Sequence, residues 1–361
     1  MRVCFVCIEI FAWGKYGGFG RATRSIGREL IRRGIDVTAV IPRRMDQRPA
    51  EMLDGFRVLG FEPGNVAQAY RLYREADADI YHSEEPSFGT FVAMRAMPHR
   101  KHIVTFRDTR DARDWQIESR LPTLSRFQVW TNRVYEDNFL VHEAVRKADA
   151  RFAASYIVAR KARLKYHLRA EPPFLPTPVD IPAKVEKADQ PTVCFMARWD
   201  KRKRPELFFE LARQFPDVKF IAAGASRNRV WDEALRAQYA TLPNLEMTGF
   251  LDQFNGLRHD EVLARSWILI NTSAREGLPV SFVEAAAHHC AILSSVNPDD
   301  FASRFGYFVE GDDFADGLRF LLENGRWRAL GEKAFQYVNG TFAAPLAVQK
   351  HMEIYQDLLN K

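Results

Sequence analysis

The sequence predicts an α/β chain with two parallel sheets, and three observations support this prediction. Short apolar strands alternate with helices along the chain. The alternation runs twice, because the proline-rich stretch from Pro172 to Pro182 interrupts it and a second run starts at Pro191. The length of 361 residues exceeds what one hydrophobic core usually supports. We therefore expect a first domain over residues 1–175 and a second domain over residues 176–344.

The first run opens with the apolar segment Arg2–Ile8, which predicts a strand. Phe19–Arg33 is expected to form a helix that ends at Gly34, a typical C-cap residue. Cys4 and Cys7 lie inside the first strand and would point to opposite faces, so a structural role is favoured over a redox pair. Further strands are expected at Asp36–Ile41, Ile80–His82, Ile103–Phe106 and Ala150–Ala154, with a long helix around Phe127–Lys147.

The second run repeats the pattern and ends in helices. The last two helical stretches are Phe314–Tyr337, with a break near Asn324, and Pro345–Leu359. Strands are expected at Thr192–Ala197, Lys219–Ala223, Leu245–Thr248, Trp267–Asn271 and Ala291–Ser295. Two open parallel sheets joined by a linker leave a cleft between domains, and ligands favour the carboxyl ends of such strands.

Composition narrows the class of protein. No apolar run is long enough to span a bilayer, and the N-terminus resembles a first strand rather than a signal peptide. Four cysteines without a dense pattern indicate a reducing compartment, so we expect a cytoplasmic protein. Residues 1–170 hold 30 Lys and Arg against 20 Asp and Glu, whereas residues 171–361 hold 22 against 26. The basic first half suits an anionic acceptor or membrane surface, and no nucleic-acid-binding module is recognisable.

The segment from Glu276 to Glu284 carries most of the functional information. Two carboxylates flank a Gly/Pro turn and the start of a helix, directly after the predicted strand at 267–271. Pro279 suits the first helical position, and a helix N-terminus at the end of a parallel strand favours anions. Carboxylates suit vicinal hydroxyls, so the layout fits a nucleotide-diphosphate sugar. The alternative is that both glutamates are solvated helix-end charges.

Two further segments have the character of phosphate sites. Arg198 to Arg204 holds five cations in seven residues between a strand and a helix, and such cations can grip a diphosphate. Gly17 and Gly18 follow the first strand and would let backbone approach a phosphate closely. The third glycine of the dinucleotide fingerprint is absent after Gly20. A solvated basic loop and a structural tight turn are the alternatives.

Together these residues resemble the retaining glycosyltransferases of family 4 (group 1), over nearly the whole chain. The resemblance rests on the E-x7-E spacing of Glu276 and Glu284, on Gly17 and Gly18 with Arg21, and on Arg198 with Lys203. It implies a GT-B architecture, in which two Rossmann-like domains with parallel sheets face each other across a cleft. The last helix, 345–361, would cross back onto the first, acceptor-side domain.

The resemblance also implies roles for individual residues. Glu284 would hold the donor ribose, Glu276 would contact the transferred sugar, and Arg198 and Lys203 would neutralise the diphosphate. Glu276, Arg198 and Lys203 are therefore the expected catalytic residues. The implied donor-binding set is Gly17, Gly18, Arg198, Lys203, Gly277, Leu278, Pro279, Val280 and Glu284.

Some positions depart from the family pattern. Arg107 stands where the family often carries histidine, and it could bind an anionic acceptor or the donor phosphate, or form a structural salt bridge. His82 and Arg21 are further candidates for contact with acceptor or sugar, and a hydrogen-bonded structural histidine is the alternative for His82. No metal site is expected, because His288 and His289 lack a third ligand nearby.

The sequence therefore predicts sugar transfer from a nucleotide-diphosphate donor to an acceptor hydroxyl, with the anomeric configuration retained and without a metal or cofactor. The setting would be bacterial cell-surface glycan or glycolipid synthesis, and the acceptor a glycan, a glycolipid or another hydroxyl compound. The basic segment Arg146–Arg169 has two interpretations, namely peripheral contact with the inner face of the cytoplasmic membrane and an ordinary amphipathic helix with an exposed basic side. The alternatives are a catalytically silent nucleotide-sugar-binding protein and a Rossmann oxidoreductase.

Overall fold

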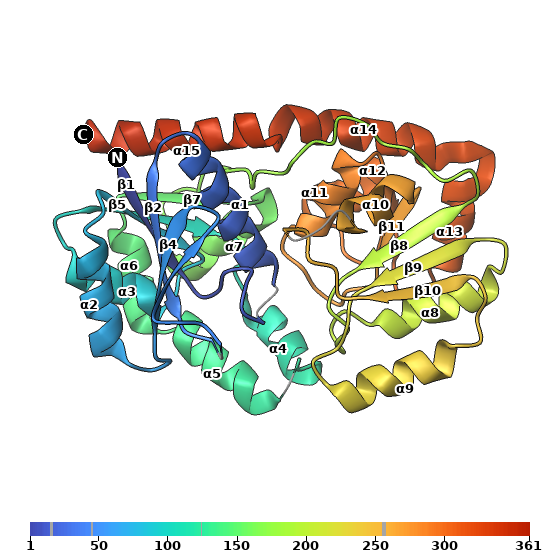
Figure 1. Ribbon diagram of the computed structural model, residues 1–361, viewed down its shortest axis with the longest axis horizontal. Coiled ribbons are helices and arrows are strands. Elements are labelled where there is room, and N and C mark those ends of the chain that lie inside the picture. The colour runs from blue at the N-terminus through green and yellow to red at the C-terminus, as the bar shows by residue number, and fades with distance from the viewer. Residues whose placement is uncertain (15–16, 45, 124, 255–257) are drawn as a thin grey trace. The chain divides into compact units, whose positions relative to one another are not determined.

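The computed structural model describes residues 1–14, 17–44, 46–123, 125–254 and 258–361 (Figure 1). The chain divides into two compact units. The sequence-based division placed residues 112–129 in the first domain, whereas the structure packs them with the second unit. The first unit contains Met1–Asp111, Trp130–Pro178 and Ala344–Lys361, and the second contains Ala112–Val129 and Val179–Ala343.

The first unit is built on a seven-stranded sheet of order β3-β4-β2-β1-β5-β6-β7. Its strands are parallel except β3, which pairs antiparallel with β4. The order reverses between β1 and β5, which is where open α/β sheets bind ligands. The strands are β1 (Arg2–Cys7), β2 (Asp36–Pro42), β3 (Ala50–Leu53), β4 (Phe56–Phe61), β5 (Ile80–Glu84), β6 (Lys101–Phe106) and β7 (Ala150–Ala153).

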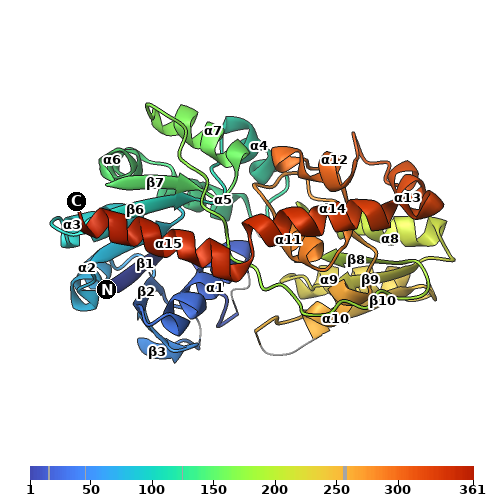
Figure 2. The same ribbon diagram turned by 90° about the horizontal axis from the view of Figure 1, so that it is seen from above.

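Helices cover both faces of this sheet because alternate strand residues point to opposite sides. Phe5 and Cys7 of β1 pack in one cluster with residues of α1 and α15, whereas Cys4 and Val6 pack with α2 and α3. Both thiols are therefore buried on opposite faces, as predicted. The C-terminal helix lies across the sheet of this unit (Figure 2). The helices are α1 (Gly18–Arg32), α2 (Val66–Ala76), α3 (Phe88–Ala96), α6 (Phe139–Lys147), α7 (Tyr156–Tyr166) and α15 (Ala344–Leu359).

The second unit holds a six-stranded parallel sheet of order β10-β9-β8-β11-β12-β13. Its order reverses between β8 and β11, so the loops that follow these two strands begin side by side. The strands are β8 (Thr192–Met196), β9 (Lys219–Ala223), β10 (Leu245–Gly249), β11 (Ile268–Asn271), β12 (Ala291–Ser294) and β13 (Gly306–Phe308).

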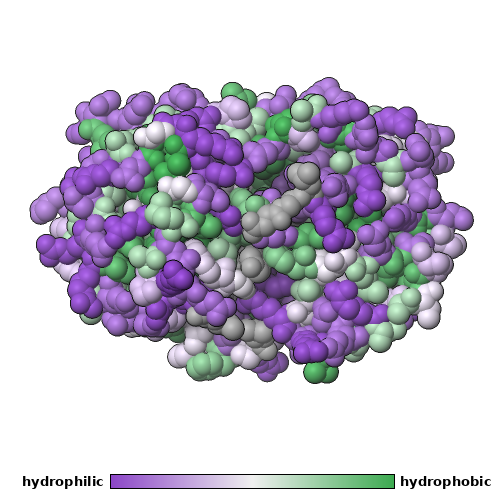
Figure 3. Space-filling view, viewed as in Figure 1, coloured by the Kyte–Doolittle hydropathy of each residue, from purple (hydrophilic) through white to green (hydrophobic). Residues whose placement is uncertain are grey.

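A large apolar cluster of this unit joins Val193 and Phe195 of β8 to residues of α8, α13 and α14. Most of the surface seen in Figure 3 is hydrophilic, with apolar residues in scattered groups. The helices of the unit are α4 (Ala112–Arg120), α8 (Pro205–Gln214), α9 (Arg229–Tyr239), α10 (Arg258–Arg265), α11 (Val280–Ala287), α12 (Phe301–Phe305), α13 (Ala315–Leu322) and α14 (Arg326–Thr341). Helix α5 (Arg126–Glu136) spans the boundary between the two units.

The structure differs locally from the sequence expectations, for example in the strand β13, which was not predicted. The helix expected around 127–147 is split into α5 and α6, because the Asn138 side chain accepts hydrogen bonds from the first backbone N–H groups of α6 and starts a new helix. The strands β3 and β4 form a hairpin that was not predicted. The expected break near Asn324 is present, where Asn324 has a φ of 54° between α13 and α14.

The hydroxyl of Tyr355 links the C-terminal helix to the sheet of the first unit, since it lies 2.7 Å from Nδ1 of His82 on β5. Both side chains are fully buried. Tyr355→Phe should lower the free energy of unfolding by about 1–3 kcal/mol, because a buried ring nitrogen would lose its partner. Urea unfolding checks this, with Tyr70→Phe on the exposed part of α2 as the control. Equal stability of both variants would contradict it.

Candidate active site

Two loops meet at the switch point of the second sheet. Thr272 Oγ1 donates to the Lys203 carbonyl at 2.6 Å, and the Ala274 N–H donates to the Arg202 carbonyl at 2.9 Å. The Arg204 Nε returns a hydrogen bond to the Thr272 carbonyl at 2.6 Å. The basic loop after β8 and the loop after β11 are therefore held against each other by side-chain and backbone hydrogen bonds.

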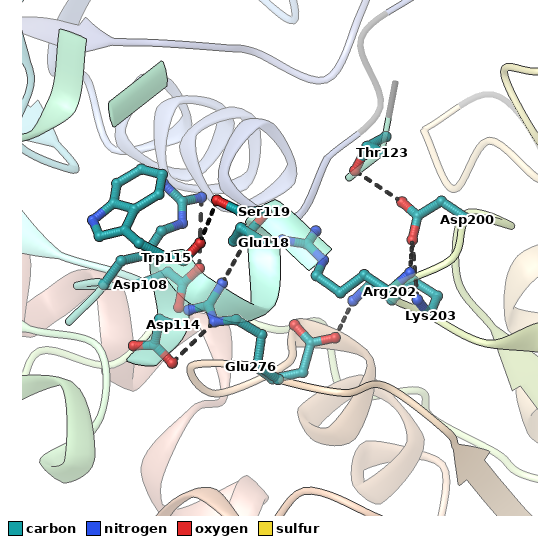
Figure 4. Close-up of polar contacts among 12 residues, drawn as sticks. Asp108, Asp114, Trp115, Glu118, Ser119, Thr123, Asp200, Arg202, Lys203 and Glu276 are labelled. Carbon is teal, nitrogen blue, oxygen red and sulfur yellow. Dashed lines mark hydrogen bonds and ion pairs between the residues drawn. The ribbon is translucent and has the colours of Figure 1, made fainter. Parts of the chain in front are cut away.

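Lys203 and Glu276, one from each of these loops, form a direct ion pair (Figure 4). Each side chain is 16% exposed, so the pair borders solvent without being fully surrounded by it. The resemblance implies that Lys203 contacts the diphosphate and that Glu276 contacts the sugar. The structure brings these two groups together as one neutral pair.

Asp200 shapes the basic loop from within. Its carboxylate accepts hydrogen bonds from the backbone N–H groups of Arg202 and Lys203 at 3.1 and 3.0 Å. Arg198 donates to the same carboxylate through Nε at 2.9 Å. Burial alone would raise the pKa of Asp200, but the neighbouring cations of Arg198, Arg202 and Lys203 hold it below its ordinary value. Asp200 is thus ionised, and its contacts hold Arg198, Arg202 and Lys203 of the basic loop around its carboxylate.

Helix α11 begins at Val280, with Pro279 as its N-cap at φ −61° and ψ 129°. The extended ψ of Pro279 keeps it just outside the helix, one position earlier than predicted. Gly277, Leu278 and Pro279 thus form the turn that leads into the helix N-terminus, where backbone N–H groups favour anions. This part of the predicted donor site lies directly after Glu276.

Glu284 lies on the second turn of α11 and is largely buried. Its carboxylate is 3.6 Å from Nε2 of His259, a buried residue on α10. His288 Nδ1 is hydrogen-bonded to the Glu284 backbone carbonyl at 2.8 Å, and burial lowers the pKa of this histidine. His259 was missed by the sequence analysis, because one histidine near the start of a helix gives no pattern that links it to a distant glutamate.

The glycine turn of the first unit holds a carboxylate of the chain itself. Gly17 is the N-cap of α1, and the Gly20 N–H donates to Oε1 of Glu9 at 3.0 Å. A Cβ on Gly17 would lie only 2.1 Å from that oxygen, so a side chain there would displace the Glu9 carboxylate. The Arg21 guanidinium lies over the Phe11 ring, 5.4 Å from its centroid. Glu9, which the sequence analysis did not consider, thus lies where Gly17 and Gly18 were expected to meet phosphate.

His82 and Arg107 belong to a buried polar network of the first unit. Besides Tyr355, His82 contacts Thr105 Oγ1 through Nε2 at 2.7 Å, and burial together with the Arg107 charge lowers the pKa of His82 to about 3. Arg107 is paired with Glu84 and donates to Thr177 Oγ1 at 2.7 Å. This arrangement matches the structural alternatives stated above for His82 and Arg107.

Metal ligands do not gather anywhere in the part of the chain that the structure describes: no group of three His, Cys, Asp or Glu side chains there could hold an ion.

Glu85 follows β5 and has a backbone φ of 81°, which is unusual for a residue other than glycine. Its carboxylate accepts hydrogen bonds from the backbone N–H groups of Arg107 at 2.5 Å and Asp108 at 2.9 Å. Burial outweighs these bonds and raises the pKa of Glu85 to about 7. The folded chain therefore favours the neutral carboxyl.

This shift makes stability depend on pH. The stabilising contribution of neutral Glu85 is complete below its unfolded pKa, near 4.5, and is lost as pH rises through 7. Glu85→Gln stays neutral, so it should lose less stability than the parent chain between pH 5 and pH 8, by roughly 2 kcal/mol. Urea unfolding at both pH values measures this, with the partly exposed Glu246→Gln as the control. An identical pH dependence of parent and Glu85→Gln would refute the assignment.

Comparison with known proteins identifies the family. The model of the glycosyl transferases group 1 matches residues 178–336, and that of Glycosyltransferase Family 4 matches residues 16–181. No curated protein matches the chain in sequence.

Solved structures share the fold at low sequence identity. Sucrose-phosphate synthase from Thermosynechococcus elongatus matches with a TM-score of 0.77 and 14% identity over 99% of both chains. Anabaena HepE in complex with UDP-glucose matches with a TM-score of 0.74 and 14% identity, over 99% of this chain and 100% of that chain. A glycosyltransferase from Rickettsia africae matches with a TM-score of 0.66 and 13% identity, over 99% of this chain and 98% of that chain. The two family models, which between them cover residues 16–336, place the chain in the group 1 glycosyltransferases, and the solved structures show that its fold is GT-B.

Proposed function

We propose that this glycosyltransferase moves a sugar from a nucleotide-diphosphate donor to an acceptor hydroxyl with retention of the anomeric configuration. The observation that supports this proposal most strongly is the Lys203–Glu276 ion pair at the switch point of the second sheet. A cation for phosphate and a carboxylate for sugar hydroxyls lie there in contact, beside a helix N-terminus. We further propose bacterial cell-surface glycan or glycolipid synthesis as the setting.

The donor diphosphate would replace Glu276 as the partner of Lys203. In the ligand-free chain Lys203 and Glu276 neutralise each other, and both are partly shielded from water. A diphosphate carries more negative charge than one carboxylate and offers Lys203 and Arg198 several acceptor oxygens. Its arrival would release Glu276 toward the sugar hydroxyls. Donor binding and placement of Glu276 would then be one event.

The remaining roles follow from position. The N–H groups at the start of α11, in the segment 277–280, would contact the sugar and phosphate, and Glu284 would hold the ribose. The Glu284 carboxylate already lies 3.6 Å from Nε2 of His259 on α10. In the first unit, Gly17 and Gly18 would meet the diphosphate only if Glu9 withdraws from the α1 N-terminus.

In the transfer step, the acceptor oxygen forms a bond to the anomeric carbon while the bond from that carbon to the diphosphate oxygen breaks. The diphosphate leaves with the electron pair, and with front-side attack it also takes the acceptor proton. Lys203 and Arg198 would stabilise the charge that builds on the leaving phosphate. In this proposal these side chains supply the positive charge that a metal would otherwise provide.

One alternative remains distinct after the family assignment, namely a catalytically silent protein that binds nucleotide sugars. Release of nucleoside diphosphate from a panel of donors separates the two, and UDP-glucose is the first donor to test because the similar Anabaena HepE binds it. Nucleotide-sugar binding without release in the presence of acceptors would favour the silent protein.

Glu276→Ala should lower turnover by about 10²-fold, because the sugar loses its carboxylate contact. The same change frees Lys203, so the affinity for UDP should stay equal or rise. Arg198→Ala should weaken both turnover and UDP binding. Donor kinetics and UDP titration calorimetry measure these effects. Glu246→Ala removes a carboxylate from another Lys–Glu pair of the unit and serves as the control. Parallel loss of turnover and UDP affinity in Glu276→Ala would remove Glu276 from the proposed role.

Peripheral membrane contact is a second part of the proposal. Within the described residues no helix is long and apolar enough to cross a bilayer. Helix α7 exposes Tyr156 and Leu164, at 55% and 66%, and it exposes Arg160 and Arg163 between them. Apolar side chains among cations suit an anionic lipid surface.

The parent chain should therefore co-sediment with phosphatidylglycerol vesicles more than with phosphatidylcholine vesicles, and less at high salt. Arg160→Glu with Arg163→Glu should reduce binding several-fold by repelling the lipid charge. Arg229→Glu with Arg328→Glu makes the same charge change on exposed positions of the second unit and should leave binding unaltered. Equal binding by both double variants would exclude α7 as the membrane surface.

A further inference from the structure

Helix α4 comes from the first half of the sequence but packs within the second unit. Three of its residues are buried, namely Asp114, Trp115 and Glu118. These positions share one face of a helix because the spacing of four residues is about one turn. The buried face of α4 is thus acidic, and burial of carboxylates requires partners.

Two arginines are those partners, and they lie on the loops after β8 and β11. We call these two loops, residues 198–204 and 272–276, the donor loops. Glu118 Oε1 pairs with Arg202 and, at 2.8 Å, with the Nη1 of Arg275. Asp114 Oδ1 lies 3.2 Å from Nε of Arg275. Figure 4 shows Asp114 and Glu118 on α4 beside the loops that carry Arg202 and Glu276. One carboxylate of α4 therefore bridges cations from both loops.

The bridged arginines are the chain neighbours of the proposed site residues. Arg202 precedes Lys203, and Arg275 precedes Glu276. Thr123, just after α4, adds a hydrogen bond to Asp200 Oδ2 at 3.3 Å. The segment 112–123 thus contacts the two donor loops immediately beside the Lys203–Glu276 pair.

Resting on the function proposed above, we infer that Glu118, assisted by Asp114, is a positioning residue that keeps Arg202 and Arg275 away from Glu276. Two guanidinium groups held close together repel each other unless a carboxylate lies between them. Burial alone would lower the pKa of Arg202, but Glu118, Asp200 and Glu276 raise it, while Arg275 opposes the rise. Without Glu118, Arg202 would keep Asp200 and Glu276 as the carboxylates that attract it, and its attraction for Glu276 would draw that side chain away from the sugar.

Charge balance provides the test. Arg202 and Arg275 oppose Asp114 and Glu118, so the cluster is neutral. Glu118→Gln keeps the shape and leaves one excess positive charge. We expect kcat to fall at least tenfold, while the affinity for UDP by calorimetry stays equal or rises. Adding Arg275→Gln restores neutrality, so the double variant should recover at least part of the lost kcat.

A merely structural Glu118 would give a different result, with kcat, UDP affinity and unfolding midpoint falling together and the double variant falling further. Unchanged kcat in Glu118→Gln would also overturn the inference. Glu210→Gln is the matched control, because Glu210 accepts from Arg213 and Tyr239 in the same unit at 2.9 and 2.6 Å. It should leave kcat unaltered.

Amide hydrogen exchange tests the positioning role of Glu118 without a measurement of enzyme activity. Glu118→Gln should speed amide exchange at least several-fold in residues 198–204 and 272–276, with no change in the first unit. Unchanged exchange in both loops would refute the inference. If the proposed function is wrong, the parent chain releases no nucleotide from any donor. In that case the hydrogen-exchange result still tests whether Glu118 positions the two donor loops.

Discussion

Charges that are partly removed from water must be paired, and this constraint organises the second unit. Five cations on the loops after β8 and β11 are each matched by a carboxylate that comes from these loops or from elsewhere in the unit. The pairs are Arg198–Asp200, Arg202–Glu118, Lys203–Glu276, Arg204–Asp312 and Arg275–Asp114. A loop with this density of positive charge would repel itself and extend into solvent if these carboxylates were absent. The pairing lets the loops fold back onto the sheet edge.

The pairs differ in burial, and that difference suggests which ones serve binding. The arginine facing Asp114 and Glu118 is almost completely buried, whereas Lys203, Glu276 and Arg198 keep some contact with solvent. Breaking a buried pair strands a charge, but a pair at the surface can exchange one partner for a ligand of the same charge. The same loop can therefore contain a permanent framework and an exchangeable pair.

The first unit also pairs its buried charges, but there the partners leave the glycine turn occupied by a carboxylate of the chain. Its carboxylates near the strand ends have partners within the unit: Glu84 pairs with Arg107, Glu85 accepts from two backbone N–H groups, and Glu9 accepts from the Gly20 N–H at the start of α1. The glycine turn after β1 is consequently occupied by an internal anion. Any phosphate at that position would have to compete with Glu9.

From the sequence alone we could predict the two alternating α/β runs, the strands β8 and β11, and the placement of Glu276 before a helix N-terminus. These features depend on hydrophobic periodicity and on local turn chemistry, which act over a few residues. Only the folded structure shows that Lys203 pairs with Glu276, that Glu118 contacts the donor loops, and that His259 lies beside Glu284. Those partners are separated by between 25 and 157 residues of chain, and no local pattern encodes such a contact. The reason is physical: which charges neutralise one another depends on where the sheet order and the packing of α4 bring them, and only the folded chain sets that.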